Sequence, residues 1–140
     1  MLDKRTAQMK VQELADCYKA TDYLKEMCRI EEEGDPEEAA LKWIALAVLH
    51  GVNANAESVS LRRHPDGQVT VLAQYRDTFL PSPGSGVGEK VIEAIRRITH
   101  FEKDKEKGPW AFGWGNESLE LRVKVKRKDG QETVTIEFPK

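Results

Sequence analysis

The chain has 140 residues, of which 39% are hydrophobic, so a single domain with a substantial core is expected. Charged residues make up 33% of the sequence with both signs mixed, and the net charge of −2 gives no general attraction to nucleic acid or membranes. No apolar run approaches the roughly 20 residues that span a bilayer, and the N-terminus lacks the apolar core of a signal peptide. The two cysteines imply no disulfide framework, so a cytoplasmic location is expected.

The first third of the sequence predicts helices. Apolar residues recur at spacings of three and four between Val11 and Cys28, until the segment EEEGDPEEAA interrupts the pattern. Asp35 is expected to cap a second helix, and Pro36 suits its first turn. The helix should end at Gly51, a residue type common just past the end of a helix.

The period of the apolar residues changes to two after this helix, which predicts strands. The segments SVSLR and VTVLA flank the turn HPDGQ and form a first hairpin. A helix is expected from about Glu89 to His100, followed by the solvated loop FEKDKEKGP and the strand WAFGWGN. A second hairpin then pairs LELRVKV with TVTIEF across RKDGQ.

These elements predict a single α+β domain in the order α-α-β-β-α-β-β-β. Its antiparallel sheet should have about five strands, two hairpins plus one strand, packed by helices. We divide the chain into an N-terminal helical segment, residues 1–34, and an α+β region, residues 35–140, within one compact unit.

The segment PSPGSGVGEKVIEAIRRI raises the question of a phosphate-binding loop. Such a loop needs a glycine, four residues, a second glycine, a lysine and then serine or threonine. Here Glu89 stands where the second glycine is required, and Val91 occupies the serine or threonine position. A carboxylate at that point repels phosphate, and valine cannot bind magnesium. The sequence therefore favours a flexible connection between a strand and a helix.

No set of residues indicates catalysis. His50, His64 and His100 lie far apart in the sequence, and the two cysteines, Cys17 and Cys28, have no zinc-ligand spacing and are expected to be buried thiols. No serine lies in a nucleophile-elbow motif. We therefore expect no catalytic residues, no metal and no cofactor, and a protein that is not an enzyme.

Two segments are candidates for a binding surface. In LELRVKVKRK, Arg122, Lys124 and Lys126 alternate with apolar residues and should share the outer face of a strand. This row suits phosphates or an acidic partner, or is a solvated face whose lysines discourage edge pairing. In the second segment, Trp110 and Trp114 share one side of a strand, where they form either part of the core or a contact surface.

The order of several motifs carries a family resemblance. The helix through LKWIALAVLHG leads into AESVSLR, in which Ala56, Val59 and Leu61 match an ASDIHIE-like strand. A PDG turn follows, then VLAQYRDTFLPSP at the place of an RYRIDG-like strand, and LELRV at the place of a VDLRV-like strand. Over residues 38–138 this order resembles the domain that precedes the motor core in type II secretion and type IV pilus assembly ATPases.

In that family, the domain lends arginines to nucleotide held by the motor domain that follows it. The arginine of the RYRIDG-like motif falls near Gln74 here, with Arg76 two places later. The paired arginines of the family's charged stretch fall at Glu106 and Lys107, whereas Arg122 matches the arginine of the VDLRV-like strand. The resemblance thus implies vestigial phosphate-contact positions at Arg76, Lys107 and Arg122. The motor domain itself, with its phosphate loop, is not in this sequence.

We therefore expect a non-catalytic protein-interaction module, either a detached relative of this domain or a fragment of a longer protein. Its partner should be a secretion or pilus motor ATPase, or a second copy of itself, and membrane insertion is not expected. The candidate contact residues are Arg122, Lys124, Lys126, Trp110 and Trp114. Nucleic acid is not the expected partner, and the alternative, which ranks second, is binding of nucleotide or nucleic acid by the basic face of the sheet.

Overall fold

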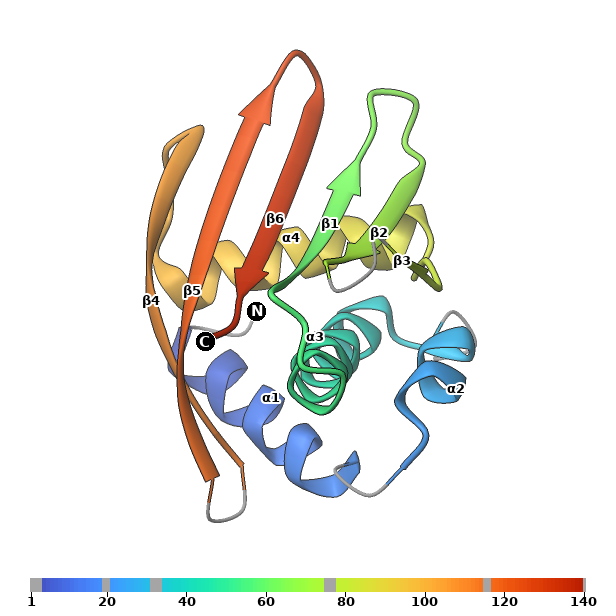
Figure 1. Cartoon of the computed structure of the whole chain (residues 1–140). Helices are drawn as coiled ribbons and strands as arrows, with labels where there is room; N and C mark the ends of the chain where they lie inside the picture. The colour runs from blue at the N-terminus through green and yellow to red at the C-terminus, as the bar shows by residue number, and fades with distance from the viewer. Residues whose placement is uncertain (1–3, 19–20, 31–33, 75–77, 115–116, 140) are drawn as a thin grey trace.

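A computed structural model of the chain describes residues 4–18, 21–30, 34–74, 78–114 and 117–139. These residues form a six-stranded antiparallel sheet with helices packed against one of its faces, which confirms the predicted single α+β domain (Figure 1). The helices are α1 (Lys4–Tyr18), α2 (Tyr23–Cys28), α3 (Pro36–Asn53) and α4 (Ser85–Thr99). The strands are β1 (Ser58–Arg63), β2 (Val69–Ala73), β3 (Thr78–Leu80), β4 (Lys105–Trp114), β5 (Glu117–Lys128) and β6 (Gln131–Glu137).

The strands lie in the order β3-β2-β1-β6-β5-β4. Both predicted hairpins are present, and the pairing of β1 with β6 joins them into one sheet. In the β5–β6 turn, Asp129 and Gly130 both have positive φ, as a tight two-residue hairpin turn requires. The sheet has one strand more than the five or so expected, because the three-residue β3 adds to the outer edge of β2. A third helix also precedes the first strand, since Asp22 caps a separate short α2.

Helix α3 is the centre of the core. The Asp35 side chain accepts a hydrogen bond from the backbone N–H of Glu37 at 3.0 Å, and Pro36 occupies the first turn, as predicted. The helix continues to Asn53, however, so the prediction that it ends at Gly51 is wrong. Gly51 lies inside the helix rather than at its end. The residue is a glycine because the ring of Phe138 packs directly against its backbone, where no side chain fits.

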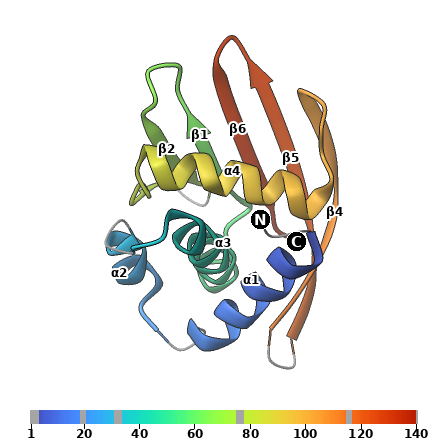
Figure 2. The ribbon, with the colours of Figure 1, turned by 180° about the vertical axis from the view of Figure 1, so that it is seen from behind.

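Helix α4 lies across the face of the sheet that Figure 2 presents to the viewer. It begins at Ser85, so the glycine-rich segment is not wholly a connection: residues 85–88 form the first turn of the helix. Gly84 precedes the helix with a φ of 88°. Gly88 faces the sheet so closely that a Cβ atom would lie 2.6 Å from Cγ2 of Val69. This glycine therefore allows close packing of helix on sheet, and no phosphate site is needed to explain it.

The long strand β4 is one edge of the sheet and begins at Lys105, inside the segment predicted as a loop. Helix α1 seals part of this edge with two side-chain hydrogen bonds. Nε2 of Gln8 donates to the carbonyl of Ala111 at 3.1 Å, and the N–H of Gly113 donates to Oε1 of Gln12 at 2.9 Å. The N-terminal helix is thus tied to the sheet as well as packed on α3.

Alternation along the strands gives the sheet two different faces. Val59, Leu61, Val123 and Ile136 are buried among the helices, together with the other inward-facing apolar residues of the sheet. The intervening residues lie on the opposite side, which no described helix covers and which we call the open face (Figures 1 and 2). The sheet thus has one face in the core and one face toward solvent.

We predict that Gly51→Ala destabilises the protein by about 1–3 kcal/mol, because the new methyl group forces the Phe138 ring out of its packed position. The matched control is Gly86→Ala in α4, where a Cβ atom has open space and the helix gains intrinsic propensity. This control should leave the free energy of unfolding unchanged or raise it by less than about 1 kcal/mol. Urea titration of both variants measures the difference. Equal stabilities would show that the Phe138 contact does not matter.

Candidate functional site

The register of the strands arranges the open face in straight rows of side chains. One row reads Lys105, Lys126, Thr133, Arg62 and Thr70 across β4, β5, β6, β1 and β2. The next row reads Lys107, Lys124, Thr135, Ser60, Leu72 and Phe79, from one edge of the sheet to the other. Cations thus gather on β4 and β5, and hydroxyl groups on the strands in the middle.

A groove of about 730 Å³ runs over this part of the open face. Its side chains include Thr133 and Thr135 of β6, a strand that lies between the lysines of β4 and β5 and Arg62 of β1. We call it the basic groove, after its six exposed cationic residues: Arg62, Lys105, Lys107, Lys124, Lys126 and Lys128. Six positive charges in one groove are notable in a chain whose net charge is −2.

Two pairs of lysines face each other across adjacent strands. Lys105 is opposite Lys126, and Lys107 is opposite Lys124 in the β4–β5 pairing. Like charges directly opposite in a sheet are destabilising by a few tenths to about 1 kcal/mol. This arrangement therefore costs stability unless an anion lies between the lysines.

Few carboxylates offset these charges. Glu137 pairs with Lys124 at 3.2 Å, whereas Lys105, Lys107 and Lys126 have no ion pair within the ranges that the structure describes. Glu106 also borders the groove, but its Oε1 accepts hydrogen bonds from the backbone N–H groups of residues 103 and 102, at 2.7 and 2.9 Å. These bonds, the one from residue 103 foremost, hold the pKa of the Glu106 carboxyl below its ordinary value. The Glu106 carboxylate is therefore bonded to the backbone of the loop before β4 rather than to a lysine of the groove.

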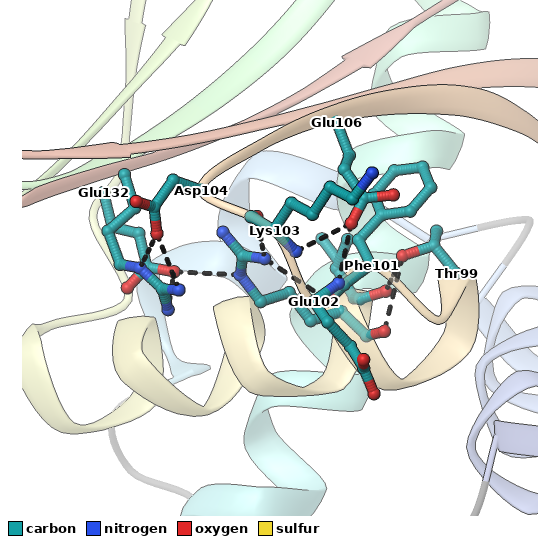
Figure 3. Close-up of polar contacts among 10 residues, drawn as sticks. Thr99, Phe101, Glu102, Lys103, Asp104, Glu106 and Glu132 are labelled. Carbon is teal, nitrogen blue, oxygen red and sulfur yellow. Dashed lines mark hydrogen bonds and ion pairs between the residues drawn. The ribbon is translucent and has the colours of Figure 1, made fainter.

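A polar network on the helix side of the sheet supports the groove from behind (Figure 3). Arg96 of α4 donates from Nε to Glu132 of β6 at 3.0 Å, and from Nη1 to the carbonyl of Lys103 at 2.8 Å. Arg127 of β5 binds Asp104 through Nε and Nη2, at 3.0 and 2.9 Å. The network fastens α4 to β6 and the start of β4 to the end of β5. Each of the two arginines in this network has a carboxylate partner, whereas most lysines of the basic groove have none within the described residues.

The structure brings most of the predicted basic residues together. Lys124 and Lys126 line the basic groove, and so does Lys107, one of the positions implied by the family resemblance. Arg122 lies on the same face one row further along β5, where it is opposite Pro109 and Glu137. Arg76, the remaining position, falls outside the described residues.

Trp110 is not part of an exposed platform with the basic residues. Trp110 is 5% exposed and packs edge-on against Phe112, with ring centroids 5.2 Å apart. This burial agrees with the alternative of a place in the core, and it leaves little of the Trp110 side chain for a partner to contact. The side chain of Trp114 lies outside the described part of the structure.

Arg62, Lys105 and Lys128 were not predicted as site residues. Lys128 continues the period-two row of Lys124 and Lys126, so the alternation alone offered a signal for it. Lys105 was hidden in a charged segment that is typical of loops. Arg62 joins the groove only through the pairing of β1 with β6, which no local pattern predicts.

The other candidate residues do not converge. His50 is buried near the end of α3, where burial lowers the pKa of its imidazole, and Cys17 and Cys28 are exposed rather than buried as predicted. The residues that the structure describes contain no group of three or more histidine, cysteine, aspartate or glutamate side chains able to hold a metal ion. Nor does any described helix have the length and apolar character required to cross a bilayer.

Comparison with known proteins gives no identification: no family model matches the chain, and no curated protein matches it. The resemblance to the secretion and pilus ATPase domain therefore stays a prediction, and the site must be interpreted from its own geometry.

We predict that Lys126→Glu stabilises the protein by about 0.2–1 kcal/mol, because it turns the like-charge pair with Lys105 into an attractive one. The gain should shrink as salt screens the charges. Denaturant unfolding at low and high ionic strength measures both effects. In the control, Lys105→Glu combined with Lys126→Glu restores a like-charge pair and should abolish the gain. A loss of stability in the single variant would contradict the electrostatic interpretation.

We predict that Glu132→Gln destabilises the protein by about 1.5–3 kcal/mol, because Arg96, whose side chain is only 12% exposed, loses its charged acceptor. The control is Glu93→Gln, which removes an ion pair of similar length, 3.1 Å, between the half-exposed Glu93 and Lys90. Solvent-exposed pairs contribute little, so the control should change stability by less than about 1 kcal/mol. Thermal and urea unfolding distinguish the two; equal losses would mean that the network adds no more than an ordinary surface pair.

Proposed function

We propose that the protein is a non-catalytic binding module that holds an anionic macromolecule against the open face of its sheet. The observation that carries this proposal is that lysines of the basic groove face each other on adjacent strands: Lys105 faces Lys126, and Lys107 faces Lys124. A sheet that retains opposed like charges at a cost in stability is typical of a functional surface, where binding compensates for the local conflict.

The distribution of charge supports an anionic partner. The chain as a whole is slightly negative, yet six exposed cations lie around one groove. A groove lined by charges of one sign focuses the electric field and raises the local concentration of oppositely charged ligands. Binding there should accordingly depend on the local field and fall with ionic strength.

The chemistry of the groove favours a macromolecule over a small metabolite. Sites for small molecules are mostly apolar, with a few polar groups that orient the ligand. The side chains of the basic groove are mainly exposed lysines with two threonines between them. Such a surface offers many equivalent contacts to a repeating anion rather than one enclosed pocket.

The predicted motor partner is compatible with the same surface. Lys107 and Arg122, two positions implied by the family resemblance, both lie on the open face. A motor ATPase that docks there would have to present an acidic surface. Any such partner should lose affinity when the charge of the groove is reversed.

We predict that the protein is retained on immobilised heparin, used here as a general polyanion, and that the double variant Lys124→Glu/Lys126→Glu elutes at much lower salt. Reversal of two groove charges removes attraction and adds repulsion. The measurement is the salt concentration at elution, checked by circular dichroism for a preserved fold.

The matched control is Lys25→Glu/Lys90→Glu, which reaches the same net charge through exposed residues of α2 and α4, away from the open face. It should elute close to the unmodified protein. The proposal fails if the groove variant and the control elute together, because binding would then follow total charge alone.

A further inference from the structure

The open face changes character from one edge of the sheet to the other. Along a single row, the cations Lys107 and Lys124 give way to the hydroxyl groups of Thr135 and Ser60, whose oxygens lie 3.0 Å apart. Beyond them, Leu72 of β2 is opposite Phe79 of β3. Phe79 is 72% exposed, although a large aromatic side chain is normally at least partly buried. The same face therefore offers charge at one side and an aromatic ring at the other.

The residue types of the groove favour nucleic acid over an acidic protein. Five of its six cations are lysines. Lysine is depleted in protein–protein interfaces, which prefer aromatic residues and arginine around an apolar centre. Interfaces with nucleic acid are polar and strongly positive, and they take many of their hydrogen bonds to phosphate from lysine, serine and threonine. Lysines flanking Thr133 and Thr135 match this second composition.

We propose that the anionic partner is a single-stranded nucleic acid, with its phosphates in the basic groove and an unpaired base stacked on Phe79. This inference rests on the proposed function of the groove and specifies its ligand. It reverses the order of the predicted partners, in which nucleic acid ranked second.

The dimensions of the sheet suit one strand that crosses it. Neighbouring strands lie about 4.8 Å apart, so the four spacings from Lys124 on β5 to Phe79 on β3 amount to roughly 19 Å. Several nucleotides of an extended strand cover such a distance, and a site of about 4–16 nucleotides is typical of one OB-fold domain that binds single strands. A duplex keeps its bases paired and stacked inside, so its bases cannot lie on the Phe79 ring.

The test uses fluorescein-labelled oligonucleotides of about 12 nucleotides, oligo-dT and oligo-rU, and a duplex of equal length, with fluorescence anisotropy as the readout. The protein should bind at least one of the single strands more tightly than the duplex, and comparison of dT with rU distinguishes DNA from RNA. Phe79→Ala should weaken single-strand binding by about 5- to 150-fold, the range measured for loss of one stacked base. Phe79→Trp should preserve it, because the ring remains.

Two further variants separate stacking from charge. Leu24→Ala removes another exposed apolar side chain, on α2, and should leave affinity unchanged. Lys105→Gln/Lys126→Gln should weaken binding and reduce the slope of log affinity against log salt by about 0.7 for each lost phosphate contact.

The inference is overturned if the duplex binds as tightly as the single strands, if Phe79→Ala binds within twofold of the unmodified protein, or if poly-L-glutamate displaces the oligonucleotide equally well. It is also overturned if no oligonucleotide binds while retention on heparin persists, since the partner is then another kind of polyanion. In each of these cases the groove still binds anions and the proposed function stands. That function falls as well if neutralising Lys105 and Lys126 changes neither oligonucleotide binding nor retention on heparin.

Discussion

The pairing of β1 with β6 is the constraint on which the rest of the structure depends. It joins two hairpins that are separated by strand β3, helix α4 and strand β4 in the sequence, and it makes a single sheet wide enough to cover the helical core. The same pairing places Arg62 across Thr133 from Lys126, so the two sides of the basic groove come from distant parts of the chain. Burial of the inward residues of both strands holds this register, because a slip by one residue would expose Leu61 and Ile136 to water.

Local patterns were sufficient to predict the parts of the fold that depend on neighbouring residues. Period-two alternation predicted the hairpins and the shared face of Arg122, Lys124 and Lys126, and the Asp35-Pro36 pair predicted the start of α3. The failures have a common cause in tertiary contacts. Gly51 does not end the helix; it is a glycine because the ring of Phe138, far along the chain, packs against its backbone. The start of β4 has the composition of a loop, and its pairing with β5, together with the ion pair between Asp104 and Arg127, holds it as a strand.

The distribution of ion pairs indicates which charges serve the fold and which are available for binding. On the helix side, Arg96 is matched by Glu132, as expected for two side chains that are largely removed from water, and the exposed Arg127 is matched by Asp104. On the open face, exposed lysines lie opposite one another and mostly lack carboxylate partners within the described residues. A solvated lysine tolerates this arrangement at modest cost, so the open face can keep its charge for a ligand without loss of the fold.

The hydrogen bonds between helix α1 and the edge strand β4 affect whether another copy of the protein can pair with that strand. An uncovered edge strand of ten residues is normally a template on which further chains add and aggregates grow. Here the amides of Gln8 and Gln12 occupy backbone groups of that edge, and Pro109 brings no N–H to its middle. The opposite edge, β3, offers only three residues. A strand added to β4 would thus meet occupied backbone groups and a proline, and a strand added to β3 would find only three residues to pair with.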